Sequence, residues 1–499
     1  MNLNDTALLK SQAFLEGRWS DSDTGKTFAV VDPATGDEIR HVPRCGKDET
    51  RRSIETAAKA LPGWRAKTAK ERARVLRRWA DLIMENADDL ATILTAEQGK
   101  PLAEAHGEIA YGASFLEWFG EEAKRVYGDT IPANSPDVRI LVTKEPVGVV
   151  GGITPWNFPI AMPARKAAPA LAAGCTMVLK PAEQTPLSAL AFAELGVRAG
   201  LPRGVLSVVT GAAEDAPVIG SELTGNPIVR KIGFTGSTEV GKLLMEQCAP
   251  HIKRISLELG GNAPFIVFDD ADLDSAVDGA ILCKFRNSGQ TCISANRILV
   301  QEGVYEEFTE RLVDAAKGLV VGRGTSPDSQ VGPLIDTQGF EKAKRHVADA
   351  LERGARQLLG GGPHALGGTF FEPTVLVDVV DEADMSCEET FGPVAGLSSF
   401  STEDEAIAIA NDTRYGLAAY FYSRDVGRIW RVSEQLEFGI LGVNTGFIST
   451  EVAPFGGFKE SGIGREGSKY GIEEWLEIKY HCLGDIERDE TSERRIDDE

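Results

Sequence analysis

Seven cysteines are scattered along the 499 residues, and Cys292 stands in a setting that suits a nucleophile. In the segment FRNSGQTCISANR, a glycine and polar side chains come just before the sulfur, which leaves backbone room and supplies hydrogen-bond donors. A thiolate is a strong nucleophile where its surroundings lower its pKa. The other six have no such company, and we predict them to be small buried apolar residues: Cys45, Cys175, Cys248, Cys283, Cys387 and Cys482.

Two polar residues in apolar surroundings are candidate partners for this thiol. Glu258, in SLELGGNAP, ends an apolar strand just before a double glycine. The carboxyl end of a strand is where sites form in α/β proteins, although Glu258 taken alone could equally be a paired structural charge. Asn157, in the proline-bounded loop TPWNFP, is by itself more typical of a turn.

The elements that position these residues follow from hydrophobic periodicity. Charged segments with one apolar face predict helices over residues 48–98. From residue 148 the pattern changes to short apolar runs, namely VGVVGGI, TMVLK, VLSVV, VRKIGF and RISLEL. Helical compositions around 160–174, 186–199 and 237–248 separate most of these runs. The alternation predicts an α/β fold with a doubly wound, mostly parallel sheet.

A second α/β set begins near residue 263, where APFIVF, ANRILV and TVLVDVV are strand-like and helices are expected near 272–286 and 303–317. LGG at 259–261 is a plausible hinge between the two sets. The segments 138–146 and 474–482 look like isolated strands that could form an arm and pair with another subunit. The end of the chain, DIERDETSERRIDDE, is charged and nearly free of apolar anchors, so we expect it to be disordered.

Composition excludes several classes of function. A net charge of -22 makes the chain a poor nucleic-acid binder, because neutralising phosphates requires a basic face. The odd number of cysteines without CxxC spacing indicates reduced thiols and no metal site. The N-terminus lacks the apolar core of a signal peptide, and no apolar run is long enough to span a bilayer. We therefore expect a cytoplasmic protein.

Taken together, the motifs resemble the aldehyde dehydrogenase superfamily. They occur in the order and spacing of that family: TPWNFP (154–159), KPAEQTP (180–186), FTGSTEVG (234–241), LELGGNAP (257–264), GQTC (289–292), EETFGPV (388–394) and PFGGFKESGIGRE (454–466). The resemblance implies a Rossmann-like NAD-binding domain, a second α/β catalytic domain and a small β-strand oligomerisation arm. We place them at 1–126 with 147–258, at 259–465, and at 127–146 with 466–485, followed by an acidic tail at 486–499.

The resemblance also implies roles for the three polar residues. Cys292 attacks the aldehyde carbon, and the Asn157 amide and the Cys292 backbone N–H hold the oxyanion. Hydride then passes to the nicotinamide, and Glu258 activates the water that hydrolyses the thioester. Such a glutamate favours hydrolysis to a free acid over transfer to coenzyme A.

The cofactor site departs from the common dinucleotide fingerprint, because GSTEVG (236–241) is not GxGxxG. A Gly-Ser turn that opens a helix can still offer N–H groups to a phosphate. A carboxylate at Glu183 would accept bonds from ribose hydroxyls and repel a 2′-phosphate, which favours NAD over NADP. The cofactor residues that the resemblance implies are Thr154, Pro155, Trp156, Lys180, Glu183, Gly236, Ser237, Glu389 and Phe391.

Three further positions resemble the carboxylate-binding set of the succinate-semialdehyde dehydrogenase branch: Arg165, Arg286 and Ser449. Two guanidinium groups and a hydroxyl can clamp the far carboxylate of a short semialdehyde. Glutarate semialdehyde is a close competitor, because one methylene gives little discrimination. The alternative for each arginine is an ordinary ion pair.

One position departs from this branch, whose members often carry a second cysteine two residues after the nucleophile. Ser294 stands there, so a disulfide with Cys292 is impossible. Other readings are a dehydrogenase for betaine aldehyde or for a broad range of aliphatic aldehydes, and a non-catalytic binding or structural homologue. A cysteine hydrolase is disfavoured because the six histidines lie outside every motif. The resemblance further implies a homodimer or homotetramer.

Overall fold

Short runs of valine, isoleucine and small residues form a sheet of eight strands in the computed structural model, which describes residues 1–486. Five of these strands are mutually parallel and correspond to the five apolar runs expected from residue 148 onward. The prediction of a doubly wound, mostly parallel sheet is confirmed. In spatial order the strands are β19 (Gly462–Ile463), β11 (Arg254–Glu258), β10 (Val229–Thr235), β7 (Val149–Ile153), β8 (Thr176–Lys180), β9 (Leu206–Val208), β1 (Ala13–Leu15) and β2 (Arg18–Ser20).

The strand order of this sheet reverses between β7 and β10. The chain passes from β7 outward to β8 and β9, and it returns to β10 and β11 on the other side of β7. Loops that leave the carboxyl ends of two such strands diverge and open a crevice between them. Asn157 follows β7 and Gly236 follows β10, so both lie at this crevice.

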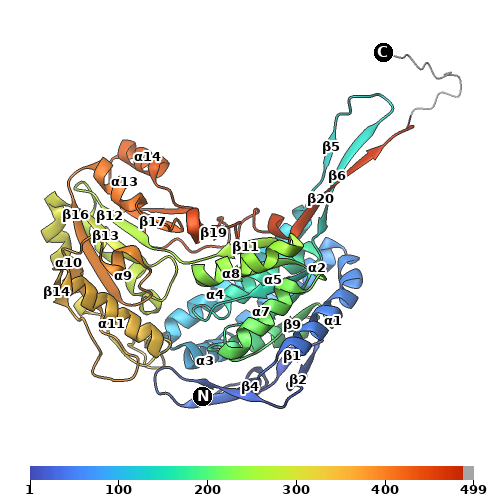
Figure 1. Cartoon of the computed structure of the whole chain (residues 1–499), viewed down its shortest axis with the longest axis horizontal. Coiled ribbons are helices and arrows are strands. Elements are labelled where there is room, and N and C mark those ends of the chain that lie inside the picture. The colour runs from blue at the N-terminus through green and yellow to red at the C-terminus, as the bar shows by residue number, and fades with distance from the viewer. Residues whose placement is uncertain (487–499) are drawn as a thin grey trace.

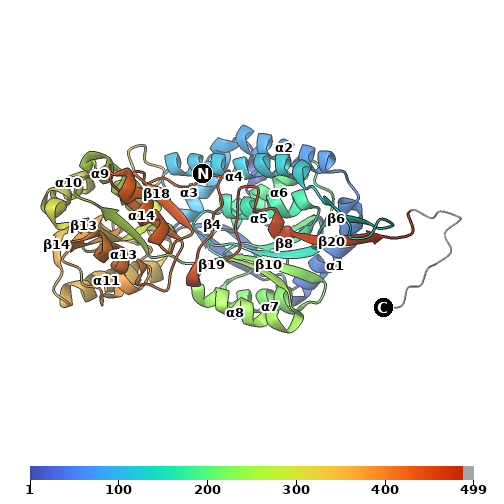
Figure 2. The same cartoon turned by 90° about the horizontal axis from the view of Figure 1, so that it is seen from above.

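Helices cover both faces of the sheet because each carries one apolar side (Figure 2). One face packs against α2 (Ala69–Glu85), α3 (Ala87–Gln98), α4 (Leu102–Glu122), α5 (Ala161–Ala173) and α6 (Pro186–Arg198). The other packs against α1 (Lys47–Arg65), α7 (Ala216–Gly225) and α8 (Thr238–Cys248). None of the helices within residues 1–486 is both long and apolar enough to cross a membrane.

A second sheet of seven strands lies beside the first (Figure 1). Only its edge strand β14 is antiparallel. In spatial order its strands are β14 (Arg356–Leu359), β15 (Thr374–Val377), β16 (Val394–Phe400), β13 (Ala295–Gln301), β12 (Ala263–Val267), β17 (Ala418–Tyr422) and β18 (Ile440–Val443). Its helices are α9 (Leu273–Phe285), α10 (Tyr305–Lys317), α11 (Thr337–Glu352), α12 (Asp384–Cys387), α13 (Glu403–Asn411) and α14 (Val426–Gln435).

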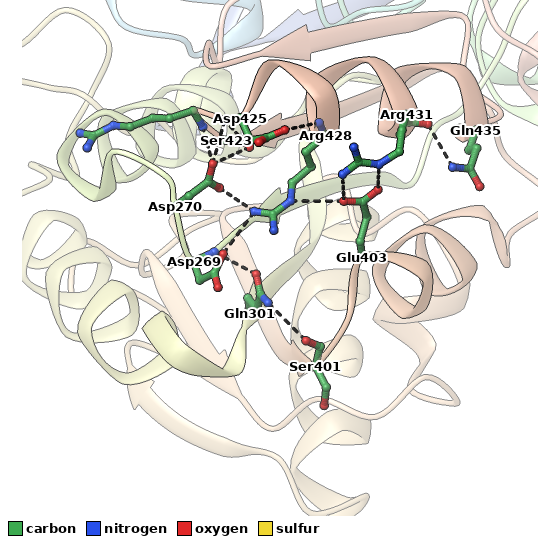
Figure 3. A network of polar contacts seen from close by, with 11 residues as sticks. Asp269, Asp270, Gln301, Ser401, Glu403, Ser423, Asp425, Arg428, Arg431 and Gln435 are labelled. Carbon is green, nitrogen blue, oxygen red and sulfur yellow. Dashed lines mark hydrogen bonds and ion pairs between the residues drawn. The ribbon is translucent and has the colours of Figure 1, made fainter.

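An ion-pair network occupies the carboxyl edge of this second sheet (Figure 3). Arg428 of α14 lies at its centre, with Nη1 2.7 Å from Asp270 Oδ1 and 3.2 Å from Asp269 Oδ1, just beyond β12. Its Nε lies 3.3 Å from Glu403 Oε2 at the start of α13. These charges occupy part of the edge where α/β sheets usually bind ligands, whereas Cys292, which precedes β13, lies at the opposite, amino edge of the second sheet.

Three antiparallel strands project from the body as an arm (Figure 1): β5 (Asp129–Ile131), β6 (Arg139–Pro146) and β20 (Leu476–Leu483). The two segments expected to be isolated strands, 138–146 and 474–482, thus pair with each other. A separate hairpin contains β3 (Thr27–Val31) and β4 (Glu38–Pro43). The domain boundaries remain a proposal, and the predicted disordered tail, apart from Ile486, lies outside the described residues.

Candidate active site

A cavity of about 510 Å³ lies where the two large sheets face each other. It brings together residues that the sequence places far apart. The predicted site residues among its lining are Cys292, Glu258, Asn157, Pro155, Trp156, Gly236, Ser237, Glu389, Phe391, Arg165, Arg286 and Ser449. Thr154, Lys180 and Glu183 are not part of that lining, although Thr154 N donates to Lys180 O at 3.1 Å beside it.

The two sheets contribute opposite edges to this cavity. Glu258 is the last residue of β11, and Asn157 follows β7, so the first sheet presents carboxyl ends. Cys292 precedes β13, and Glu389 precedes β16, so the second sheet presents amino ends. The glycines between β11 and β12 allow this approach, because a Cβ on Gly261 would lie 2.3 Å from Cys292 O. The expected hinge is thus a point of close packing.

Cys292 is partly exposed, and its surroundings do not make it a ready thiolate. Burial, reinforced by the nearby Glu389 carboxylate, raises the pKa of the thiol to about 12. At neutral pH the sulfur therefore carries its proton, and nucleophilic attack requires that this proton leave. Of the other cysteines, four are buried as predicted, whereas that prediction is wrong for Cys387 and Cys482, which are exposed.

Asn157 lies against the loop that carries the nucleophile. Its Nδ2 donates to Gln290 O at 3.2 Å, and its backbone carbonyl accepts from Lys100 Nζ at 2.8 Å. Lys100 is itself buried and paired with Glu108 at 2.6 Å. An amide nitrogen has two N–H groups, so one bond to Gln290 leaves the second free for a ligand.

The Glu258 side chain is buried, and neither carboxyl oxygen has a hydrogen-bond partner within the described residues. Burial and the nearby Glu466 carboxylate raise the pKa of Glu258 well above its usual range. A buried carboxyl group without hydrogen-bond partners lowers the stability of the fold, so its presence points to a functional role. Its raised pKa suits a group that must accept a proton near neutral pH.

The two candidate arginines differ in their surroundings. Arg165 Nη2 lies 2.7 Å from Glu466 Oε2, and its Cζ lies 4.0 Å from the centre of the Phe455 ring. Burial raises the pKa of the Glu466 carboxyl, but Lys166 and Arg165 outweigh that effect and leave it below its usual range. Lys166 Nζ also lies 2.6 Å from Glu466 Oε1, so Arg165 shares this carboxylate with a second cation. Arg165 is thus part of an ion pair, as its alternative reading supposed.

Arg286 has no such partner. Within residues 1–486 no carboxylate oxygen lies within 4.0 Å of its guanidinium, whose Nη2 donates to Ser449 Oγ at 3.4 Å. Its Cζ lies 5.7 Å from the Phe158 ring centre and 5.4 Å from the Phe447 ring centre. An arginine and a hydroxyl between aromatic rings form a site for an anionic group.

The residues around GSTEVG fit a dinucleotide. Ser237 caps α8, accepting from Val240 N at 3.3 Å, and Gly236 N donates to Glu258 O at 3.1 Å. The first turn of α8 thereby opens at the cavity, where its N–H groups suit a phosphate. On the opposite wall, Glu389 Oε1 accepts from Gly261 N at 3.1 Å, and Phe391 packs edge-on against Trp156.

Several residues of the site were missed by the sequence reasoning. Glu466 ends the motif PFGGFKESGIGRE, yet only the structure shows that it pairs with both Arg165 and Lys166. Lys100 and Glu108 lie beyond the helices predicted over 48–98, and nothing in their local sequence indicated their place beside the site. Tyr111 lines the cavity with its buried hydroxyl unpaired among the described residues, and nothing in its local sequence indicated this.

Comparison with known proteins accounts for this arrangement. The profile of the aldehyde dehydrogenase family matches residues 19–481. The chain is 63% identical over 486 residues to the glutarate-semialdehyde dehydrogenase of Pseudomonas aeruginosa, covering 97% of this chain and 100% of that protein. It is 61% identical over 484 residues to the succinate-semialdehyde dehydrogenase [NADP(+)] GabD of Escherichia coli, again covering 97% and 100%.

A solved structure of the same family is also similar to this chain. The crystal structure of succinate-semialdehyde dehydrogenase from Burkholderia pseudomallei matches with a TM-score of 0.96 and 59% identity, covering 97% of this chain and 100% of that one. The resemblance drawn from seven motifs is confirmed: this chain belongs to the aldehyde dehydrogenase family.

Proposed function

We propose that this enzyme oxidises a short aldehyde that carries a carboxylate at its other end, namely succinate semialdehyde or glutarate semialdehyde, to the dicarboxylate. The observation that carries the proposal is the unpaired guanidinium of Arg286, which lies with Ser449 in the cavity of Cys292. Contacts with the ring faces leave the guanidinium N–H groups of Arg286 available to bind an anion. The two curated relatives described above are named for these two substrates.

The reaction assigns one task to each side chain. After its proton passes to water, the Cys292 sulfur bonds to the aldehyde carbon, and the carbonyl oxygen becomes an oxyanion held by the Asn157 amide and the Cys292 N–H. The start of α8, Glu389 and Phe391 would hold NAD(P), which would supply the acceptor for the hydride that leaves the former aldehyde carbon as the oxyanion re-forms the C=O bond of the thioester. Glu258 then takes a proton from water, whose oxygen bonds to the thioester carbon while the C–S bond breaks. Arg286 and Ser449 hold the distant carboxylate throughout.

A substrate panel tests the proposal. In Arg286→Ala, the KM for both semialdehydes should rise about 10- to 100-fold, because a charge-assisted bond is lost, while that for hexanal should change less than about threefold. Ser449→Ala should give a smaller effect of the same sign. Equal effects on hexanal and on the semialdehydes would instead favour a broad-specificity aliphatic aldehyde dehydrogenase.

The same assay addresses the non-catalytic alternative. Aldehyde-dependent NADH formation should be present in the natural enzyme and absent in Cys292→Ala. A natural enzyme that formed no NADH with any aldehyde of the panel would support a binding or structural role.

For the cofactor we propose NAD in preference to NADP. The Glu183 carboxylate lies 3.6 Å from Lys180 Nζ at the end of β8, where it would repel a 2′-phosphate. The Escherichia coli relative is named for NADP(+), which makes NADP the alternative. We expect a higher kcat/KM with NAD, and a gain for NADP in Glu183→Ser. A higher kcat/KM with NADP in the natural enzyme would refute this preference.

We further propose that the arm joins subunits into a homodimer or homotetramer. Its three strands are largely exposed, and β20 pairs only with β6 among the strands of the described chain. A cytoplasmic location stays a prediction, based on thiols that suit a reducing compartment.

A further inference from the structure

Three consecutive residues just before the nucleophile adopt the left-handed backbone conformation. Asn287 has φ 52° and ψ 33°, Ser288 has φ 57° and ψ 31°, and Gly289 has φ 74°. Two non-glycine residues in this region are strained and persist only where their surroundings hold them. Gly289 has no alternative, because a Cβ there would lie 2.1 Å from Gly392 O.

Asn287 is the residue through which this turn is held. It is buried, with 1% of its surface exposed. Its backbone N donates to Glu104 Oε2 at 2.8 Å, and its Oδ1 accepts from Gln98 Nε2 at 3.0 Å. Its backbone carbonyl accepts from Gln290 N at 3.0 Å and from Gln290 Nε2 at 3.1 Å. The backbone N–H, the backbone carbonyl and the side-chain oxygen of Asn287 are thus all hydrogen-bonded, which leaves its side-chain nitrogen to be described.

That nitrogen bridges the two loops that supply the oxyanion donors. Asn287 Nδ2 donates to Asn157 O at 3.1 Å and to Gln290 O at 3.1 Å. Gln290 O is also the acceptor of the Asn157 side-chain amide. A single amide group therefore ties the backbone of one donor residue to the loop that leads directly into the other, Cys292.

We propose that Asn287 is a positioning residue for oxyanion stabilisation: its left-handed turn and its side-chain amide hold the Asn157 amide and the Cys292 N–H at the separation that the oxyanion requires. The inference rests on the proposed function, because it takes these two groups to be the donors. Donors that are fixed in advance stabilise developing charge without reorganisation, so loosening them slows the chemical step more than it weakens binding.

The test uses two variants that tolerate the left-handed backbone. Asn287→Gly removes the side chain, and Asn287→Asp keeps its size but replaces the donor with oxygen. In both, we expect the first-turnover rate of NADH formation from succinate semialdehyde to fall about 10- to 100-fold. The aldehyde KM and the Kd of NAD should stay within about threefold of the values for the natural enzyme. General loosening of the fold would instead change these constants together with the rate.

A double-mutant cycle with Asn157→Ala separates positioning from a merely structural effect. If Asn287 positions the Asn157 amide, Asn287→Gly should lower the rate by a smaller factor in the Asn157→Ala background than in the natural enzyme, and the loss that remains reports its effect on the Cys292 N–H. Asn226→Ala is the matched control, because Asn226 also bridges a side chain and a backbone N–H but lies before β10, at the sheet edge away from the cavity. It should keep the natural rate.

The outcomes distinguish the two proposals. An active natural enzyme with equally active Asn287→Gly and Asn287→Asp, or with equal losses in both backgrounds, would overturn the positioning role alone. A natural enzyme that formed no NADH with the semialdehydes or hexanal would overturn the proposed function and this inference together.

Discussion

The two proton-carrying groups of the cavity, Cys292 and Glu258, both have pKa values raised by burial. Neither ionises as readily as it would in water, so the order of proton movements governs the rate. For Glu258 the sign is clear: the carboxylate is the base, it exists above its pKa, and a raised pKa moves the onset of hydrolysis to higher pH.

The first prediction concerns this pH dependence. The kcat should fall as the pH drops through the raised pKa of Glu258, at a pH above the value near 4.3 of an ordinary glutamate. Glu258→Gln should still form NADH in a first burst but turn over about 100-fold more slowly, because only hydrolysis needs the base. Stopped-flow absorbance across pH 5–9 would measure the pH dependence of kcat and the burst. The amplitude of the burst should be on the order of one NADH per active site. A Glu258→Gln variant with unchanged steady turnover would contradict this role.

A second residue-scale prediction concerns Tyr111. Its hydroxyl is buried without a partner in the described part of the chain, and burial raises its pKa despite the nearby Arg165 and Arg286 charges. A neutral phenol beside two guanidinium groups can donate to the substrate carboxylate. A hydrogen bond to a charge is worth about 1.5–3 kcal/mol, so Tyr111→Phe should raise the semialdehyde KM about tenfold or more.

Hexanal serves as the internal control for Tyr111→Phe, because it has no carboxylate to accept the bond. Its KM should change less than about twofold. A parallel rise for both substrates would show that the ring shapes the cavity and that the hydroxyl does not bind the carboxylate.

At the scale of elements, the network around Arg428 joins α13 and α14 to the end of β12 (Figure 3). Arg428 and Glu403 are 20% exposed and Asp270 is 30% exposed, and the Arg428 Cζ lies 4.6 Å from the Phe268 ring centre. Arg428→Met keeps the apolar stem but removes the charge. We expect a loss of about 1–2 kcal/mol in unfolding free energy, measured by urea denaturation, with kcat unchanged.

Arg311→Met is the matched control for that measurement. Arg311 on α10 is 40% exposed and pairs with Asp274 and Glu307. Exposed pairs contribute little, so its loss should be below about 0.5 kcal/mol. Equal effects of the two substitutions would show that the network adds nothing beyond an ordinary surface pair.

The parts of the fold that carry their own periodicity were predictable from the sequence. The apolar runs of β7, β8, β10 and β11 and the helices α5, α6 and α8 lie where the pattern indicated, whereas α7 was not predicted. Strands β1 and β2 have three residues each, too few for any alternation to show, and they join the sheet edge through pairing with distant residues.

The site was predictable only as far as its motifs reached. Cys292, Glu258 and Asn157 could be placed in one cavity, because each lies in a distinctive segment. Their partners could not. Lys166 and Glu466 are 300 residues apart, and the bond from Asn287 to Asn157 spans 130 residues. Such pairs leave no local pattern, so the ion pair of Arg165 with Glu466 became visible only in three dimensions.

At the scale of the whole molecule, the arm stands apart from both sheets (Figures 1 and 2). Along β20, Ile478 is 70% exposed and Tyr480 is 60% exposed. A three-stranded sheet with two solvated faces buries too little apolar surface to be stable alone. Within residues 1–486 no strand pairs with the outer edge of β20, so its backbone groups can bond to a strand of another chain.

The last prediction follows from that free edge and its apolar side chains. Ile478→Lys should shift the protein toward a smaller assembly in light scattering coupled to gel filtration, because a buried lysine without a partner charge opposes association. Val426→Lys is the matched control: Val426 is also 70% exposed, but it lies on α14, away from the arm. It should leave the molar mass unchanged. A mass equal to that of the natural protein in Ile478→Lys, or an equal shift in both variants, would show that subunits do not associate through the arm.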